Sequence, residues 1–219
     1  MPSLTVENYV KQIYQICAAN GGKPATTGQL ASHLGVSPGS VTSMLKMLRE
    51  SNLVTYTPYE GVNLTPPGAA LALRIVRRHR LIEVFLAQTL GLDWGEVHDE
   101  AEHMEHAVSD LLVDRIDEYL GYPEVDPHGD PIPRADGTLL QPETQSLLAC
   151  QPGQQFRLAR VTDQSTEFLN YLSDAGLAIG AEGRLLDNRH QAGTVSIAID
   201  DREATLGHAA AAKILVALL

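Results

Sequence analysis

Cysteine and long apolar runs are both scarce in this chain of 219 residues. Its two cysteines, Cys17 and Cys150, have neither the number nor the spacing of a disulfide framework or a zinc ribbon. Such sparing use of cysteine is typical of proteins from the reducing cytoplasm. No apolar run reaches the roughly 18 residues of a membrane-spanning helix, and the first residues lack the basic flank and apolar stretch of a secretory signal. The sequence therefore predicts a cytoplasmic protein with no membrane partner.

Basic residues are also few, since 16 lysines and arginines stand against 27 acids and give a net charge of -11. Taken as a mean, this value argues against a nucleic-acid partner. The charge is nevertheless divided along the chain, with +5 over residues 1–80, -14 over 81–150 and -2 over 151–219. The basic first third suggests a surface for an anion and the acidic middle a place for cations. Two ordinary solvated surfaces are the alternative interpretation.

The first 65 residues carry the pattern of a winged helix-turn-helix. Apolar residues recur at three- and four-residue steps over 4–19, and a short helix follows from Thr26 or Thr27 to about Leu34. Gly35 ends that helix, and Ser37 caps the next one with Pro38 at its first position. Two alternating runs, 53–57 and 61–65, then predict a β-hairpin that would form the wing. A three-helix core without a DNA function is the alternative.

The helix that begins at Ser37 presents small hydroxyl side chains and one lysine on its outer face. Hydroxyls can reach phosphates and base edges, a lysine neutralises a phosphate, and free N–H groups at a helix start can bind one. Because this set offers little base-edge chemistry, we expect part of the specificity to come from DNA shape. The residues predicted to contact double-stranded DNA are Thr27, Ser37, Pro38, Gly39, Ser40, Thr42, Ser43, Lys46 and Tyr56.

The remaining chain divides into a helical middle and a β-rich end. Long helices are predicted over 66–90 and 95–120, and residues 121–153 hold six of the twelve prolines and predict a linker or an irregular crossing segment. From about Gln154 the sequence changes to short alternating runs separated by glycine turns, which indicates a small β domain. Its predicted strands are 156–161, 182–186 and 194–199, with a helix near 165–175. The predicted domains are 1–73, 74–140 and 153–219, with a linker at 141–152.

Histidines and carboxylates line one face of each helix in the acidic middle. His79 and Glu83 are four residues apart on the first long helix. On the second, offsets from His98 place Glu102, Glu105 and His106 on one stripe, whereas His103 lies off it. Several carboxylates on one stripe repel one another unless a cation neutralises them, and a divalent metal ion does so. A nitrogen and oxygen set without thiol suits Mn²⁺ or Fe²⁺, although affinity alone would favour Zn²⁺ or Cu²⁺.

These motifs together resemble the diphtheria toxin repressor family of metal-dependent regulators and its manganese-sensing branch. "LASHLGVSPGSVTSMLKML" is similar to the family's helix-turn-helix, and "LTPPGAALALRIVRRHRLIEVFL" and "VHDEAEHMEH" to its metal-binding helices. "VENYVKQIY" resembles its first helix and "DPHGDPIP" the segment after its dimerisation helices. The resemblance covers nearly the whole chain. It implies a mostly α fold with a winged helix-turn-helix, a helical dimerisation domain and a C-terminal SH3-like (FeoA-like) small barrel.

The resemblance also implies two metal sites. Glu102 stands where the iron branch has cysteine, and it matches the manganese branch. Asn8 stands where the manganese branch has aspartate, so that an uncharged ligand should lower affinity, and Lys11 replaces a ligating glutamate. A separated pair of sites therefore fits better than a close binuclear pair. The implied primary ligands are Asn8, Glu102, Glu105 and His106, and the implied ancillary ligands are His79, Glu83, His98, Gln164 and Glu167.

By resemblance, the protein is a cytoplasmic transcriptional repressor and not an enzyme. It would bind Mn²⁺, or else Fe²⁺, with Zn²⁺, Co²⁺ or Cd²⁺ as surrogates, and then bind an operator as a homodimer to control metal homeostasis genes. The apolar residues expected at the twofold interface are Leu81, Val84, Phe85, Leu111, Leu112 and Ile116. Two alternatives come from other classes. One is a winged-helix repressor that senses an organic ligand, and the other is a metal-dependent carboxylate and histidine enzyme.

Overall fold

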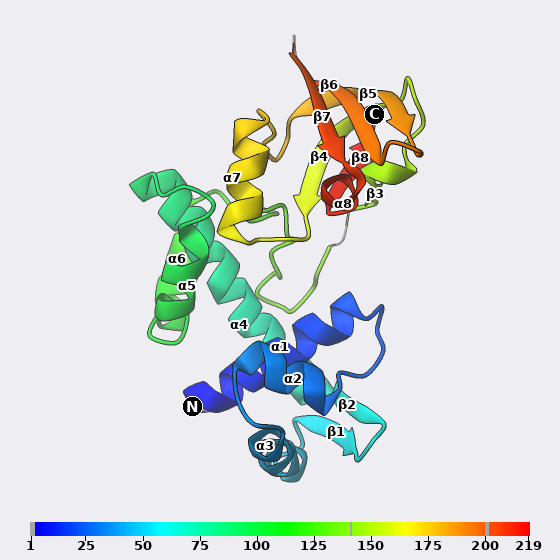
Figure 1. Cartoon of the computed structure of the whole chain (residues 1–219). Coiled ribbons are helices and arrows are strands. Elements are labelled where there is room, and N and C mark those ends of the chain that lie inside the picture. The colour runs from blue at the N-terminus through cyan, green and yellow to red at the C-terminus, as the bar shows by residue number, and fades with distance from the viewer. Residues whose placement is uncertain (1–2, 141, 200–201) are drawn as a thin grey trace. The chain divides into compact units, whose positions relative to one another are not determined.

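The computed structural model describes residues 3–140, 142–199 and 202–219 (Figure 1). The chain forms two compact units. One comprises the chain up to His79 together with Pro133–Thr138, and the other comprises Arg80–Ile132 with Leu139–Leu219. Each unit is described here by itself.

The first unit has the predicted winged helix-turn-helix order. Each of its first three helices begins after a capping residue whose hydroxyl oxygen accepts a backbone N–H of the first turn. The capping residues are Ser3, Thr26 and Ser37. Thr26 also forms a complete capping box with Gln29, and Gly35 ends its helix in a left-handed conformation. The elements are α1 (Leu4–Ala19), α2 (Thr27–Leu34), α3 (Pro38–Glu50), β1 (Val54–Thr57), β2 (Gly61–Leu64) and α4 (Pro66–Phe85), which runs on into the second unit. The predicted helices and hairpin of this unit are confirmed.

One apolar core holds these elements together. Val10 and Ile13 of α1 and Leu45 and Leu48 of α3 are fully buried in it, and Val62 of the wing packs against the same cluster. The wing is antiparallel, with Val54 opposite Leu64. The hairpin is therefore anchored to the three helices through its own buried side chains.

Gly68 lies where α4 passes close to the start of the wing. A Cβ at this position would lie 1.9 Å from the carbonyl oxygen of Leu53, which is backbone and cannot rotate away. We expect Gly68→Ala to lower the free energy of unfolding by about 1–3 kcal/mol, the usual cost of overpacking. Chemical denaturation measures the change, and Gly28→Ala, which adds its methyl to open space in α2, is the matched control. Equal stability of both variants would contradict this reading of the packing.

Two helix predictions in the middle of the chain need correction. The helix predicted over 66–90 is α4 followed by one π-helical turn, η1 (Leu86–Leu90), which Gly91 ends. The single helix predicted over 95–120 is wrong, because the chain forms α5 (Val97–Met104) and α6 (Asp110–Tyr119) with a break between them. Ser109 starts the second helix by accepting the N–H of Leu112. The capping hydroxyl, which the apolar periodicity conceals, is the physical reason for the break.

Most of the apolar residues predicted for a twofold interface are buried within the chain instead. Leu81, Val84 and Ile116 pack in one cluster with Val113 and Ile132, and Phe85 is packed against it. Only Leu111 and Leu112 of α6 remain exposed from that set, at 70% and 48%. The apolar pattern of α6 thus reflects packing on α4, which the interface prediction does not take into account.

The C-terminal β domain is a six-stranded antiparallel sheet with the order β3-β8-β4-β5-β6-β7. Its core includes the fully buried Phe156, Leu169 and Ile197. The three predicted strands and the predicted helix are present. The elements are β3 (Gln145–Ser146), η2 (Leu147–Ala149), β4 (Gln155–Val161), α7 (Thr166–Asp174), β5 (Glu182–Arg189), β6 (Thr194–Ile199), β7 (Arg202–Gly207), α8 (His208–Ala211) and β8 (Ile214–Leu218).

Among the residues that the structure describes, no helix combines the length and the apolar character that crossing a membrane requires.

Candidate metal centres

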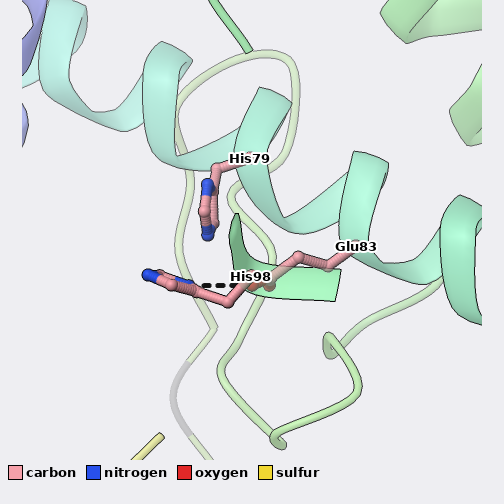
Figure 2. Close-up of side chains that lie close together, drawn as sticks. All are labelled: His79, Glu83 and His98. Carbon is pink, nitrogen blue, oxygen red and sulfur yellow. Dashed lines mark hydrogen bonds and ion pairs between the residues drawn. The ribbon is translucent and has the colours of Figure 1, made fainter. Parts of the chain in front are cut away.

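Helix α4 carries His79 and Glu83 one turn apart, and both side chains are buried. The boundary between the two units falls inside this helix, directly after His79, so the helix itself fixes the two residues relative to each other. His98 of α5 lies opposite, and its Nδ1 is 3.3 Å from Oε1 of Glu83 (Figure 2). Each of the three residues offers a ligand atom within 4.8 Å of the others. The structure therefore brings together the three predicted ancillary residues from the helices.

A buried lysine borders this group. The Nζ of Lys11 lies 3.2 Å from Nδ1 of His79, and the Lys11 side chain is only 5% exposed. An ammonium group can only donate, so Nδ1 accepts and a neutral His79 ring carries its proton on Nε2. An ammonium group at this place repels a divalent ion on the same side of His79.

The predicted primary residues of α5 also converge. Glu102 and Glu105 form a second group of potential ligands with His79, and Glu105 is completely buried. His106 lies beyond the end of α5, yet its Nε2 is 3.2 Å from Oε1 of Glu105. His103, which was placed off the stripe, is exposed as expected. Two carboxylates and two imidazoles here give a donor set of oxygen and nitrogen alone.

Asn8 provides an independent indication of a ligand. It lies on α1, in the DNA-binding unit, and its Oδ1 is buried with no hydrogen-bond partner among the described residues. A buried carbonyl oxygen without a partner costs roughly 1–3 kcal/mol. An amide oxygen is a good donor for a hard cation, so Asn8 fits the ligand role that the resemblance implies for it.

A third group was missed by the sequence analysis. Asp126 and His128 lie in the irregular segment after α6, and with Glu83 they form a cluster in which all three side chains are buried. Nδ1 of His128 is 3.8 Å from Oε2 of Glu83 and 3.9 Å from Oδ1 of Asp126. Glu83 thus turns one oxygen to His98 and the other to His128. The signal is the acid and histidine spacing in "DPHGDPIP", which the sequence analysis uses only for the resemblance to the segment after the dimerisation helices.

The electrostatics of this third group favour an added cation. Burial, reinforced by the charges of Glu83 and Asp130, raises the pKa of Asp126 to about 7, although Arg80 and His128 act against the rise. Burial alone would lower the pKa of His128, but its contacts with Glu83 and Asp126 outweigh burial and raise the pKa. A proton is therefore easily held at this cluster, where burial and neighbouring carboxylates disfavour the charged form of Asp126. A metal ion would replace a proton there.

The orientation of His128 also suits a ligand. Its Nε2 lies 2.8 Å from the carbonyl oxygen of Trp94, which can only accept, so Nε2 donates. When the ring gives up its second proton, as metal binding requires, Nδ1 is the free donor atom, and it lies 3.8 Å from Oε2 of Glu83. A ring nitrogen fixed by a backbone carbonyl is the usual support of a metal-binding histidine.

The last two predicted ancillary residues do not join these groups. Nε2 of Gln164 donates to Oδ2 of Asp130 at 2.7 Å. Glu167 is exposed in the first turn of α7 and belongs to none of the ligand groups of the described residues. The ligand roles that the resemblance implies for Gln164 and Glu167 therefore stay predictions.

A groove of about 570 Å³ runs between α2, α3 and the wing. Thr27, Thr42, Lys46 and Tyr56 of the predicted DNA-contacting residues line it. Other predicted residues shape the start of α3, where Ser37 accepts the N–H of Ser40. The hydroxyls of Thr42 and Ser43 donate to carbonyl oxygens one turn earlier, at 2.9 and 3.1 Å. The hydroxyl protons of Thr42 and Ser43 are thus engaged, while their oxygens can still accept a hydrogen bond. The expectation of shape readout stays a prediction.

Three family models match successive parts of the chain. Residues 1–62 match the iron dependent repressor N-terminal DNA binding domain, and residues 65–134 match the iron dependent repressor metal binding and dimerisation domain. Residues 145–218 match the FeoA domain. Together with the clustered ligands, these domains define a metal-dependent, DNA-binding transcriptional regulator.

Similar proteins agree with this class. The diphtheria toxin repressor of Corynebacterium efficiens is 32% identical over 195 residues, covering 84% of each chain. A manganese-dependent transcriptional repressor, solved in complex with manganese, is 40% identical with a TM-score of 0.86, over 98% of this chain and 100% of that one. ScaR with bound Zn²⁺ is 34% identical with a TM-score of 0.80, over 100% of both chains.

The chain belongs to the diphtheria toxin repressor family of metal-dependent transcriptional regulators. This family is made up of transcriptional regulators and not enzymes. The alternative of a metal-dependent carboxylate and histidine enzyme is therefore excluded. The predicted fold class, a helical N-terminal region followed by a small β domain, is confirmed.

Proposed function

We propose that this protein is a manganese-responsive repressor that binds its operator as a homodimer once the metal is bound. The observation that carries the proposal is the fully buried Glu105, which lies beside Glu102 and His106 in a donor set without thiol. Hard oxygen and nitrogen donors suit Mn²⁺, or Fe²⁺ as the second choice. The manganese complex of one similar repressor supports this choice, and the Zn²⁺ complex of ScaR supports Zn²⁺ as a surrogate, with Co²⁺ and Cd²⁺ as further ones.

The proposed primary site consists of Asn8, Glu102, Glu105 and His106. Asn8 belongs to the DNA-binding unit, whereas the other three belong to the second unit. A ligand role for Asn8 would couple the metal to the unit that carries the recognition helix. Metal binding would then favour the DNA-competent arrangement, which is a shift of population with a coupling free energy. The metal would also relieve repulsion between Glu102 and Glu105.

The proposed second site is built around Glu83. We place its ion between Glu83, Asp126 and His128, whose side chains are all buried and offer ligand atoms within 4.8 Å of one another. The set predicted from the sequence, His79, Glu83 and His98, competes for the same carboxylate. The Lys11 ammonium beside His79 makes that set the weaker one. The two sites are separate, and Lys11 stands against a close binuclear pair.

The domain limits and the setting complete the proposal. We retain 1–73 as the DNA-binding domain, 74–140 as the metal-binding and dimerisation domain, 141–152 as the linker and 153–219 as the FeoA domain.

Exposed apolar side chains on α6, namely Leu111, Leu112 and Tyr119, are the proposed centre of the twofold interface. A regulator of this kind works where the DNA is, so we infer a cytoplasmic location.

The test is a mobility-shift titration of the purified full chain with operator DNA, in parallel series of Mn²⁺, Fe²⁺, Zn²⁺ and chelator. Mn²⁺ is expected to raise DNA affinity at least tenfold, which corresponds to about 1.4 kcal/mol of coupling. Equal affinity with Mn²⁺ and with chelator would contradict the proposal. An effect of Fe²⁺ alone would keep the regulator but replace the metal.

A further inference from the structure

The single tryptophan of the chain lies beside one ligand of the proposed second site. Trp94 stands in the loop between η1 and α5. Its carbonyl oxygen accepts from Nε2 of His128 at 2.8 Å. Its indole lies parallel to the imidazole of the same residue, with ring centroids 6.4 Å apart and planes at 8°. Two parts of Trp94 therefore restrain one ring, in its rotation through the carbonyl and in its position through the indole.

The loop that carries Trp94 is a well-bonded turn. Oδ1 of Asp93 accepts the N–H groups of Gly95 and Glu96, both at 2.9 Å. In return, Oε2 of Glu96 accepts the N–H of Asp93 at 3.2 Å. These reciprocal bonds satisfy the backbone groups ahead of α5 in the way that a capping box does. The carbonyl group of Trp94 lies inside this turn, so few directions are open to it.

The indole also contacts the FeoA domain. It is half-buried against the apolar core of that domain, and its Nε1 donates to Oγ of Ser173 on α7 at 3.1 Å. At the neighbouring Gly95, a Cβ would lie 3.3 Å from Cγ2 of Thr166, also on α7. The loop therefore lies directly on α7, and this helix fixes the place of the Trp94 side chain.

The restraint decides which nitrogen of His128 faces the carboxylates. Because Trp94 engages Nε2, Nδ1 is the atom left for an ion, and it lies 3.8 Å from Glu83 and 3.9 Å from Asp126. A carbonyl acceptor on the opposite nitrogen holds the ring in orientation and raises its basicity as a ligand. Coupling of this kind is reciprocal, so an ion on Nδ1 strengthens the contact with Trp94 as much as Trp94 strengthens the hold on the ion.

We infer that Trp94 is the positioning residue of the second site and that α7 of the FeoA domain holds it in place. This role rests on the proposed ion between Glu83, Asp126 and His128, and it adds a link from that ion to the FeoA domain. Among the contacts described for Trp94, none reaches a proposed ligand of the primary site. Loss of the indole therefore weakens one of the two ions and spares the other.

Calorimetric titration of the full chain with Mn²⁺ tests this role through a pair of variants. In Trp94→Ala, which loses both the stacking and the packing on the FeoA core, one of the two manganese equivalents should bind at least tenfold more weakly. Trp94→Phe keeps an aromatic ring and loses only the bond to Ser173, so its affinity should stay within about threefold of the unmodified protein. The other equivalent, and the dependence of DNA binding on it, should be the same in all three proteins.

Leu148→Ala is the matched control for packing. Leu148 is also half-buried against the FeoA core, but the contacts described for it include none with His128 or Trp94. Its loss should leave both manganese affinities unchanged. Hydrogen–deuterium exchange in β6 reports whether the FeoA sheet is folded in each variant. A weakening by Leu148→Ala as large as that by Trp94→Ala would assign the effect to a loosened core and overturn the inference.

The fluorescence of Trp94 gives a second, spectroscopic readout in the unmodified protein. As the chain has one tryptophan, and its indole lies parallel to the ring that would bind the ion, its emission should change with the same equivalent that Trp94→Ala weakens. His128→Ala should lose this response. Emission that follows only the other equivalent would contradict the role of Trp94.

Failure of this role and failure of the proposed second site give different results. If His128→Ala loses one ion while folded Trp94→Ala binds both as tightly as the unmodified protein, the second site stands and Trp94 does not position it. If His128→Ala retains both ions, the second site itself is wrong, and the role of Trp94 is wrong with it.

Discussion

Replacing Glu105 with glutamine is expected to abolish the response of DNA binding to metal. Glutamine keeps the size and shape of the side chain, so the fold should survive, but it removes the one completely buried charge of the proposed primary site. The remaining charged ligand there is Glu102, because Asn8 is neutral. We expect Mn²⁺ to raise the DNA affinity of the unmodified protein at least tenfold and that of Glu105→Gln less than about twofold.

The matched control for this variant is His103→Ala, on the same helix. His103 is exposed and lies off the ligand stripe, so its loss should leave the manganese response unchanged. Thermal unfolding of both variants reports whether either substitution damages the fold. A tenfold response that persists in folded Glu105→Gln would remove Glu105 from the site.

The sequence predicts the DNA-binding part best because its signals are local. Ser37, Pro38 and Gly35 mark helix ends through their own backbone and side-chain chemistry, and the structure places the ends where those residues are. The break before α6 depends equally on a local cap, Ser109, but the apolar residues on both sides continue one periodic pattern. Periodicity alone then predicts one long helix in place of two.

The strands of the FeoA domain show the limit of period-based prediction. β8 is the apolar run Ile214–Leu218, in which burial alternates, with Ile214 and Val216 buried, but every residue is apolar and the sequence therefore shows no alternation. A short continuous apolar run does not distinguish a strand from a helix. The two-residue strand β3 carries no pattern at all. Both strands are defined by their partners, Val216 and Leu215 pairing with Gln145 and Ser146.

The candidate metal ligands also differ in whether the sequence alone can identify them. Glu102 and Glu105 lie on one helix at a spacing that reveals a common face, so the sequence alone identifies them. Asp126 and His128 lie in irregular chain, where no period links them to Glu83, more than forty residues earlier. Only tertiary structure brings them together, and the charge that they bury becomes evident only there.

His128 is the residue whose loss decides where the second ion binds. His128→Ala should reduce the bound manganese from about two ions per chain to about one, since it removes the only nitrogen donor from the Glu83, Asp126 and His128 group. His98→Ala should leave about two ions bound, because Lys11 already places a positive charge beside the His79 group. Elemental analysis after dialysis against Mn²⁺, followed by calorimetric titration, measures both occupancies.

Asp126→Asn is the isosteric companion to His128→Ala, and it should lose the same ion because the amide lacks the charge. If His98→Ala loses the ion while both other variants keep it, the second site is the one predicted from the sequence.

The primary site serves as the internal reference throughout. Its ligands Glu102, Glu105 and His106 are untouched in all three variants, so the first equivalent of manganese and the dependence of DNA binding on it should persist. A simultaneous loss of both ions in a folded His128→Ala protein would contradict two separate sites.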